Sequence, residues 1–332
     1  MRKFCCLILL SAVSAIAATT GYHILKQIKI GGEGGWDYLT VDSAARRLYV
    51  SHNTHVVVVD VDAGKVVGDI PDTQGVHGIA VIPELNRGFT SNGRANNVTI
   101  FDLKTLKVTG HAQTGENPDS IRYEPVSGRV FTFNGRSNNS TAIDAKTGNV
   151  AGTIALNGKP EFSVADGKGK VYANLEDTSE IVEIDAAKLS VSKRYSLKPC
   201  EEPSGLAIDT KNRRLFSVCS NRLMAVSDPD AGKVLASPAI GQGPDGAAFD
   251  PGTGYVFSSN GDGTMTVVQQ AAGKWEVVEN LATARGARTI AFDEKTHNVY
   301  LPAADVAPGP PQGQRGRLTF LPDTFKVLVV GK

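Results

Sequence analysis

Residues 206–218 read Leu206-Ala-Ile-Asp209, a polar turn, and then Leu215-Phe-Ser-Val218. This is a short apolar strand that ends in an acidic residue, followed by a second apolar strand. The same pattern occurs seven times along the chain. The last residues of the first strands are Asp42, Ile82, Glu124, Asp166, Asp209, Asp250 and Asp293. They are separated by 40 to 43 positions, and this regularity indicates a repeat protein.

Each unit continues with two further strands. The third strand alternates apolar and polar residues, as in 56–60 and 98–102, and a turn such as Asp62-Ala-Gly-Lys65 leads to a fourth strand. β-Branched and aromatic residues fill the strands, while Gly, Asn, Asp and Pro fill the turns. Four strands in about 40 residues are typical of a propeller blade. The sequence therefore predicts an all-β, seven-bladed β-propeller of four-stranded antiparallel blades.

The repeat also resembles a known family. The unit that contains Phe89-Thr-Ser-Asn92 and Asp102-Leu-Lys-Thr-Leu-Lys107 resembles the YVTN-type repeat of YncE-like β-propeller proteins. The resemblance covers residues 22–332, which we expect to form one propeller domain. It implies a periplasmic or secreted protein and is specific for the fold rather than for an activity.

The last unit is irregular, because a Pro-rich stretch at 302–311 follows its second strand. Proline cannot occupy a central strand, so the unit is short of one strand. Residues 22–30 precede the first unit and read as a strand. We expect this N-terminal strand to complete the last blade and remove a free edge. The alternative uses residues 318–321 as third strand and 326–330 as fourth.

Residues 1–17 read as a signal peptide. Arg2 and Lys3 precede an apolar run at 4–10, and Ala15-Ile-Ala17 fits the small-x-small cleavage pattern. Cleavage would give an exported protein without a membrane segment, which we expect to be monomeric. It would leave Cys200 and Cys219, which we expect to form a disulfide in an oxidising compartment. The alternative is a thiol pair that reacts or binds a metal.

Two rings of side chains are candidates for a binding site. The position five residues before each strand end holds mostly charged side chains, in the turn that enters the first strand near the propeller axis. Those in the predicted site are Asp37, His77, Asp119, Glu161, Asp245 and Arg288. The end of the second strand opens onto the same face and adds His52, Asn92, Asn134 and Asn260.

We interpret these rings as a funnel that binds a small molecule, a cation or a protein. Crowded carboxylates favour a bound cation, and Asp37, His52 and His77 are the candidate ligands for a divalent metal. The alternative is that these residues bind no ligand and only form local hydrogen bonds in turns. A second functional hypothesis is a metal- or cofactor-dependent enzyme on the same face, either a lactonase-like hydrolase or an oxidoreductase. Nucleic-acid binding is disfavoured, since the net charge is only +1.

Overall fold

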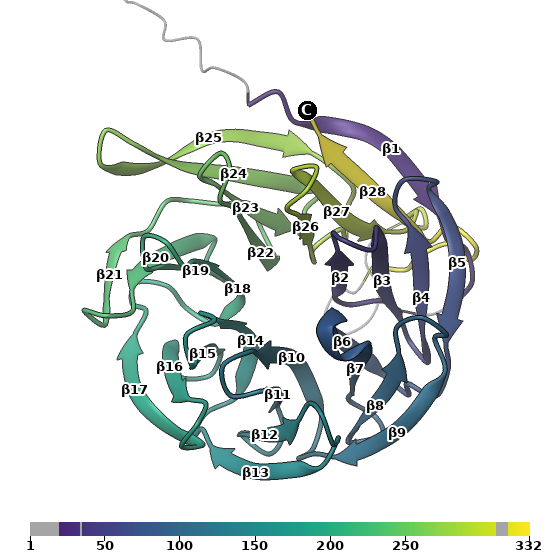
Figure 1. Cartoon of the computed structure of the whole chain (residues 1–332). Helices are drawn as coiled ribbons and strands as arrows, with labels where there is room; N and C mark the ends of the chain where they lie inside the picture. Colours follow the sequence, from purple (N-terminus) through teal and green to yellow (C-terminus); the bar gives the residue numbers. More distant parts are fainter. Residues whose placement is uncertain (1–19, 34, 310–317) are drawn as a thin grey trace, which may run out of the picture.

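The computed structural model describes residues 20–33, 35–309 and 318–332. These residues form a ring of seven four-stranded antiparallel sheets around a central axis (Figure 1), which confirms the predicted fold. The predicted signal peptide, residues 1–17, lies outside the described residues. The described part of the chain contains no helix with the length and apolarity that a bilayer span requires.

The blades follow one another along the chain. Blade 1 contains β2 (Leu39–Asp42), β3 (Arg47–His52), β4 (His55–Asp60) and β5 (Lys65–Ile70). Blade 2 contains β6 (Val76–Ile82), β7 (Arg87–Asn92), β8 (Asn97–Asp102) and β9 (Val108–Gln113), with a short 3₁₀ helix η1 (Pro83–Leu85) between β6 and β7. Blade 3 contains β10 (Pro118–Glu124), β11 (Arg129–Asn134), β12 (Asn139–Asp144) and β13 (Val150–Ala155).

Blades 4 to 6 have the same order. Blade 4 contains β14 (Pro160–Ala165), β15 (Lys170–Leu175), β16 (Glu180–Asp185) and β17 (Ser190–Ser196). Blade 5 contains β18 (Pro203–Asp209), β19 (Arg214–Cys219), β20 (Leu223–Asp228) and β21 (Lys233–Ala236). Blade 6 contains β22 (Pro244–Asp250), β23 (Tyr255–Asn260), β24 (Thr264–Ala271) and β25 (Lys274–Ala282).

Blade 7 closes the ring with strands from both ends of the chain. Its order is β26 (Ala291–Asp293), β27 (Asn298–Ala303), β28 (Lys326–Gly331) and, on the outside, β1 (His23–Lys29). Figure 1 shows β1 running along β28. The expected closure by the N-terminal strand is therefore confirmed. In the alternative, residues 318–321 would pair with β27, but Phe320 pairs instead with Val306 in an isolated bridge.

The core consists of the interfaces between blades. The second strand of every blade carries one aromatic side chain at the same place in the repeat. These side chains are at most 1% exposed: Tyr49, Phe89, Phe131, Tyr172, Phe216, Phe257 and Tyr300. The outermost strands are mostly exposed, as in β5 and β13. A blade can bury its two faces only against its neighbours, so each blade depends on the two beside it for its core.

A β-bulge lies in the innermost strand of five blades. In β10 the register shifts between Pro118 and Ile121, which pair with Asn134 and Thr132 of β11, so β10 holds one extra residue. The same shift occurs in β6, β14, β18 and β22. A bulge re-aims the side chains beside it. Here those residues include His77, Asp119, Glu161 and Asp245 of the charged ring, whereas Asp37 and Arg288 precede strands without a bulge.

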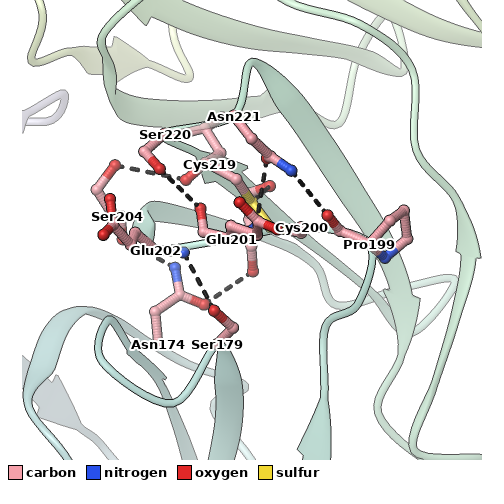
Figure 2. The surroundings of a disulfide bond; sticks show 12 residues. Asn174, Ser179, Pro199, Cys200, Glu201, Glu202, Ser204, Cys219, Ser220 and Asn221 are labelled. Atoms are coloured by element: carbon pink, nitrogen blue, oxygen red, sulfur yellow. Dashed lines mark hydrogen bonds between the residues drawn. A yellow bond between two sulfur atoms is a disulfide. The ribbon is translucent and has the colours of Figure 1, made fainter.

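A disulfide joins Cys200 and Cys219, whose Cα atoms are 5.6 Å apart (Figure 2). It connects the loop before β18 to the end of β19, and both cysteines are fully buried. Hydrogen bonds reinforce the same loop. The side-chain amide of Asn221 donates to the Pro199 carbonyl oxygen (2.8 Å), and the Ser220 hydroxyl donates to that of Glu201 (3.2 Å).

Ring closure can be tested at Ile28 of β1, which is 2% exposed and packs in one core cluster with Val327 of β28 and Leu48 of blade 1. We expect Ile28→Ala to lower the free energy of unfolding by about 2–5 kcal/mol, because it removes buried methyl groups and leaves a cavity. Urea unfolding followed by circular dichroism measures this. Leu25→Ala on the same strand is the control, since Leu25 is 42% exposed. An Ile28→Ala protein as stable as the unsubstituted one would contradict a stabilising role for β1.

The disulfide can be tested by the double substitution Cys200→Ala/Cys219→Ala. The bond closes a loop with a sequence separation of 19. On chain-entropy grounds we expect the free energy of unfolding to fall by about 3 kcal/mol. The same unfolding experiment on the unsubstituted protein, with and without reductant, is the control. Modification of both thiols by an alkylating agent in unfolded, unreduced protein would show that no disulfide exists.

Candidate functional site

The six predicted side chains of the first ring gather around the axis, on one end of the innermost strands. We call this group the axial mouth: Asp37, His77, Asp119, Glu161, Asp245 and Arg288. On one side, His77 lies between two carboxylates. Its Nδ1 atom is 2.6 Å from Asp37 Oδ2 and 3.7 Å from Asp119 Oδ1. The two carboxylates belong to blades 1 and 3, so the histidine of blade 2 joins three consecutive blades.

In the other half of the mouth, basic side chains lie beside carboxyl groups. Arg288 Nε lies 3.3 Å from Asp245 Oδ2. Lys159 Nζ lies 2.7 Å from Glu161 Oε1 and also contacts the carboxylate of Glu176. Lys159 was missed by the sequence analysis, although it directly precedes Pro160 at the entry of the first strand. The mouth therefore combines carboxylates with three basic side chains.

Burial and mutual repulsion raise the pKa values of the carboxyl groups. Desolvation, followed by the charge of Asp119, raises the pKa of Glu161 to about 9, against the opposing effect of Lys159. Desolvation raises the pKa of Asp245 to about 7, with Asp37 and Asp119 adding to it and Arg288 opposing. Asp119 rises in the same way to a pKa of about 6, although His77 opposes the shift. These groups can hold or release protons near neutral pH.

His77 is shifted in the direction of its charged form. Desolvation alone would lower its pKa, but the charges of Asp119, Asp37 and Glu161 outweigh it and raise the pKa to about 9. The imidazolium is thus the counter-ion of two carboxylates. Nevertheless Asp119 Oδ1 is a buried atom without a hydrogen-bond partner among the described residues, so the arrangement leaves one acceptor unsatisfied.

Hydrogen bonds between blades hold the backbone of the mouth. The Thr289 hydroxyl donates to the Asp37 carbonyl oxygen (2.6 Å), and the Asn174 amide donates to that of Ser204 (2.8 Å). Ser91 and Ser259 make the same kind of bond to the carbonyl oxygens of Asp119 and Arg288. Each bond runs from one blade to the next. The charged side chains therefore project from a backbone that the ring itself positions.

The asparagines of the second ring lie inside their blades. Asn134 is fully buried, and its side-chain amide donates to Asn139 Oδ1 (2.7 Å) and Thr141 Oγ1 (3.0 Å). Its own Oδ1 accepts a hydrogen bond from Thr132. Asn92 and Asn260 have equivalent bonds in blades 2 and 6. The amide nitrogen and the carbonyl oxygen of each side chain are both engaged within the blade, so we leave these three residues out of the proposed site.

His52 also lies apart from the mouth. Its ring stacks on Phe325 at 4.9 Å, and its Nδ1 is 3.1 Å from His55 Nε2. Burial, with a smaller contribution from His55, lowers the pKa of His52 to about 4. Of the metal ligands predicted from the sequence, the structure brings together Asp37 and His77. Asp119, rather than His52, is the third: ligand atoms of Asp37, His77 and Asp119 all lie within 4.8 Å of one another.

An aromatic pair lies directly below the mouth. Tyr38 of blade 1 and Phe162 of blade 4 meet across the axis, with ring centroids 4.9 Å apart at 66°. Burial raises the pKa of Tyr38 well above its usual value, and the carboxylates of Asp119 and Asp37 add to the shift. The hydroxyl of Tyr38 is therefore a neutral donor at the floor of the mouth.

The fold and the site together define a seven-bladed β-propeller with a charged axial mouth. No family model matches the chain, and no curated protein matches it. Among solved structures, the chain is similar to hydrazine synthase from Kuenenia stuttgartiensis, with a TM-score of 0.71 and 16% sequence identity. The match covers 92% of this chain and 99% of that chain. At this identity the similarity concerns the fold alone.

The charge state of His77 can be tested by NMR titration of its imidazole. We expect a midpoint near pH 9, and Asp37→Asn should move it down toward 6.5, the ordinary histidine value. Because the folded pKa is raised, the stabilisation by His77 is complete below about pH 6.5 and is lost as the pH rises through 9. His77→Gln assigns the resonance and should remove that loss. A midpoint near 6.5 in the unsubstituted protein would contradict the pairing with Asp37 and Asp119.

Proposed function

We propose that the chain is an exported, YncE-like propeller that binds a small ligand at its axial mouth, and that the ligand is a divalent cation or carries a cationic group. The observation behind this is the set of three ligand atoms on Asp37, His77 and Asp119 within 4.8 Å. They come from three consecutive blades, so the packing of blade against blade assembles them. The unpartnered Asp119 Oδ1 supplies an acceptor that a cation would satisfy.

The nature of the donors narrows the choice of cation. One imidazole nitrogen and two carboxylates suit Zn²⁺ or Mn²⁺ better than Ca²⁺ or Mg²⁺, which prefer oxygen ligands alone. His77 must lose its proton to bind a metal, and its pKa of about 9 opposes this at neutral pH. Binding of a metal should therefore release a proton and become tighter as the pH rises.

The second candidate is an enzyme on the same face, and one observation favours a metal-dependent hydrolase of the lactonase kind over an oxidoreductase. Glu161 has its pKa raised to about 9 and lies in the same mouth as the three candidate ligands. A protonated carboxylic acid beside a Lewis acid is suited to general acid catalysis of acyl transfer. The binding proposal needs only the cation, whereas the enzyme also needs Glu161.

Isothermal titration calorimetry of chelator-stripped protein with Zn²⁺, Mn²⁺, Ca²⁺ and Mg²⁺ tests the proposal. We expect one Zn²⁺ or Mn²⁺ ion per chain, with an affinity that increases from pH 6 to pH 9 as His77 is deprotonated. Titrations in buffers of different ionisation enthalpy should show the released proton. Elemental analysis of protein isolated from an exporting host would identify a metal carried from the cell.

Substitutions identify the place of binding. His77→Gln and Asp119→Asn should each abolish it, whereas His23→Gln should not, because His23 is an exposed histidine on β1. Glu161→Gln should leave metal binding intact and, if the protein is a hydrolase, remove only the activity. Failure of all four cations to bind, or binding that survives both mouth substitutions, would refute the cation site and the metal-dependent enzyme with it.

A further inference from the structure

The axial channel continues below the aromatic pair of Tyr38 and Phe162. The size of the residue at their position in the repeat differs between blades. The position that holds Tyr38 and Phe162, four residues before the strand end, is small in the other blades: Gly78, Ser120, Gly205, Gly246 and Thr289. At Gly205 a Cβ atom would lie 2.7 Å from the Asp245 carbonyl oxygen, so the blades approach closely there. Only the two aromatic side chains extend across the axis, between the mouth and the space beneath it.

That space is a cavity of about 260 Å³ lined by all seven innermost strands. Two residues before the strand end, Ala207, Ala248 and Ala291 line it with methyl groups. The equivalent residue of blade 3 is Arg122, whose long side chain lies in the same cavity. Phe162, Phe249 and Phe292 supply further apolar wall. The cavity wall therefore combines methyl and phenyl groups with backbone and hydroxyl groups and one guanidinium.

In the part of the chain that the structure describes, the positive charge of Arg122 has no negatively charged partner and only two weaker contacts. Its Nε–H donates to the Ser163 carbonyl oxygen (3.1 Å), and the guanidinium carbon lies 5.3 Å from the centroid of the Phe162 ring. No carboxylate of the described residues lies within ion-pair distance of Arg122. Desolvation lowers its pKa to about 10, and no neighbouring charge offsets the shift. A desolvated cation without a counter-ion is unfavourable, so the cavity favours an anion.

The other polar groups of the cavity are already engaged. The Thr40 hydroxyl donates to the Ile79 carbonyl oxygen (2.7 Å), and the Ser120 hydroxyl pairs with that of Ser163 (2.7 Å). Glu294 lines the cavity but is an exposed residue after the end of β26. The innermost strands begin at the mouth and end on the opposite face of the ring. Glu294 follows the end of β26, so it lies at the opening of the cavity on that face. One guanidinium with few free donors suits a singly charged anion rather than a phosphate.

We propose that this cavity is a second binding site, which takes a small organic carboxylate whose apolar body packs against Phe162, Phe249 and Phe292. The carboxylate binds the free edge of the Arg122 guanidinium through two parallel hydrogen bonds. The ligand enters from the face opposite the mouth, because Tyr38 and Phe162 separate the two compartments. The proposal is independent of any cation at His77.

Benzoate is the probe, and benzamide, which has the same shape without the charge, is its matched control. Binding to the full protein is followed by calorimetry and by protein NMR. We expect benzoate to bind and Arg122→Met to weaken it roughly tenfold to hundredfold, the effect of losing a charge-assisted hydrogen bond. Arg136→Met, which removes an exposed arginine, and His77→Gln, which alters only the mouth, should leave the affinity unchanged.

Thermal unfolding separates a binding role from a structural one. Because Arg122 lacks a counter-ion, Arg122→Met should leave the melting temperature unchanged or raise it. A marked decrease, or failure to fold, would show that the arginine serves the fold and would overturn the proposal. It is also overturned if benzoate does not bind, if benzamide binds equally well, or if inorganic phosphate binds in preference to benzoate.

Discussion

The pairing of β1 with β28 is the contact on which the rest of the structure depends. A four-stranded blade has two apolar faces and can bury them only against two neighbours. Seven blades satisfy one another only if the ring closes, and an incomplete last blade would leave an open strand edge. The chain resolves this by placing its N-terminal strand in the blade that its C-terminal strands begin. Closure then positions every innermost strand relative to the axis.

The extra residue in the innermost strands gives the axis its chemical character. Regular alternation would direct neighbouring side chains to opposite faces of the blade. The bulge near Pro118, and its equivalents in four other blades, interrupts this alternation where the strand begins. His77, Asp119, Glu161 and Asp245 lie at these bulges, and together with Asp37 and Arg288 they collect at one end of the axis. Hydroxyl groups of neighbouring blades hold the backbone at these positions through hydrogen bonds, such as those from Ser91 to the Asp119 carbonyl oxygen and from Thr289 to that of Asp37.

The axis is thereby divided into compartments of different polarity. The mouth holds carboxylates with His77, Lys159 and Arg288, and the aromatic pair of Tyr38 and Phe162 forms its floor. Below it methyl groups and phenyl rings alternate with hydroxyl and backbone groups, Arg122 lies among them, and Glu294 lies at the far opening. Electrostatic interactions are stronger inside a protein than in water, so a single charge in this compartment interacts strongly with a bound ligand. A repeat protein can thus carry distinct sites on one axis by changing one residue in one blade.

Much of this architecture follows from the sequence alone. The 40- to 43-residue spacing of strand ends such as Asp209 and Asp250 identifies the blades, and the irregular last unit predicts closure by residues 22–30. The same spacing places Asp37, His77 and Asp119 at equivalent positions in consecutive units. Periodicity is a local property of the chain, since it reflects which residues each strand must bury.

What the sequence could not supply is which equivalent side chains meet. His52 and Asn134 end their second strands alike, yet one stacks on Phe325 from the last connection and the other is enclosed by its own blade. Lys159 joins the mouth, and Tyr38 reaches Phe162 across three blades. These contacts depend on distances around a closed ring. A ring brings together residues far apart in the chain, and only tertiary structure sets how far each side chain extends toward the axis.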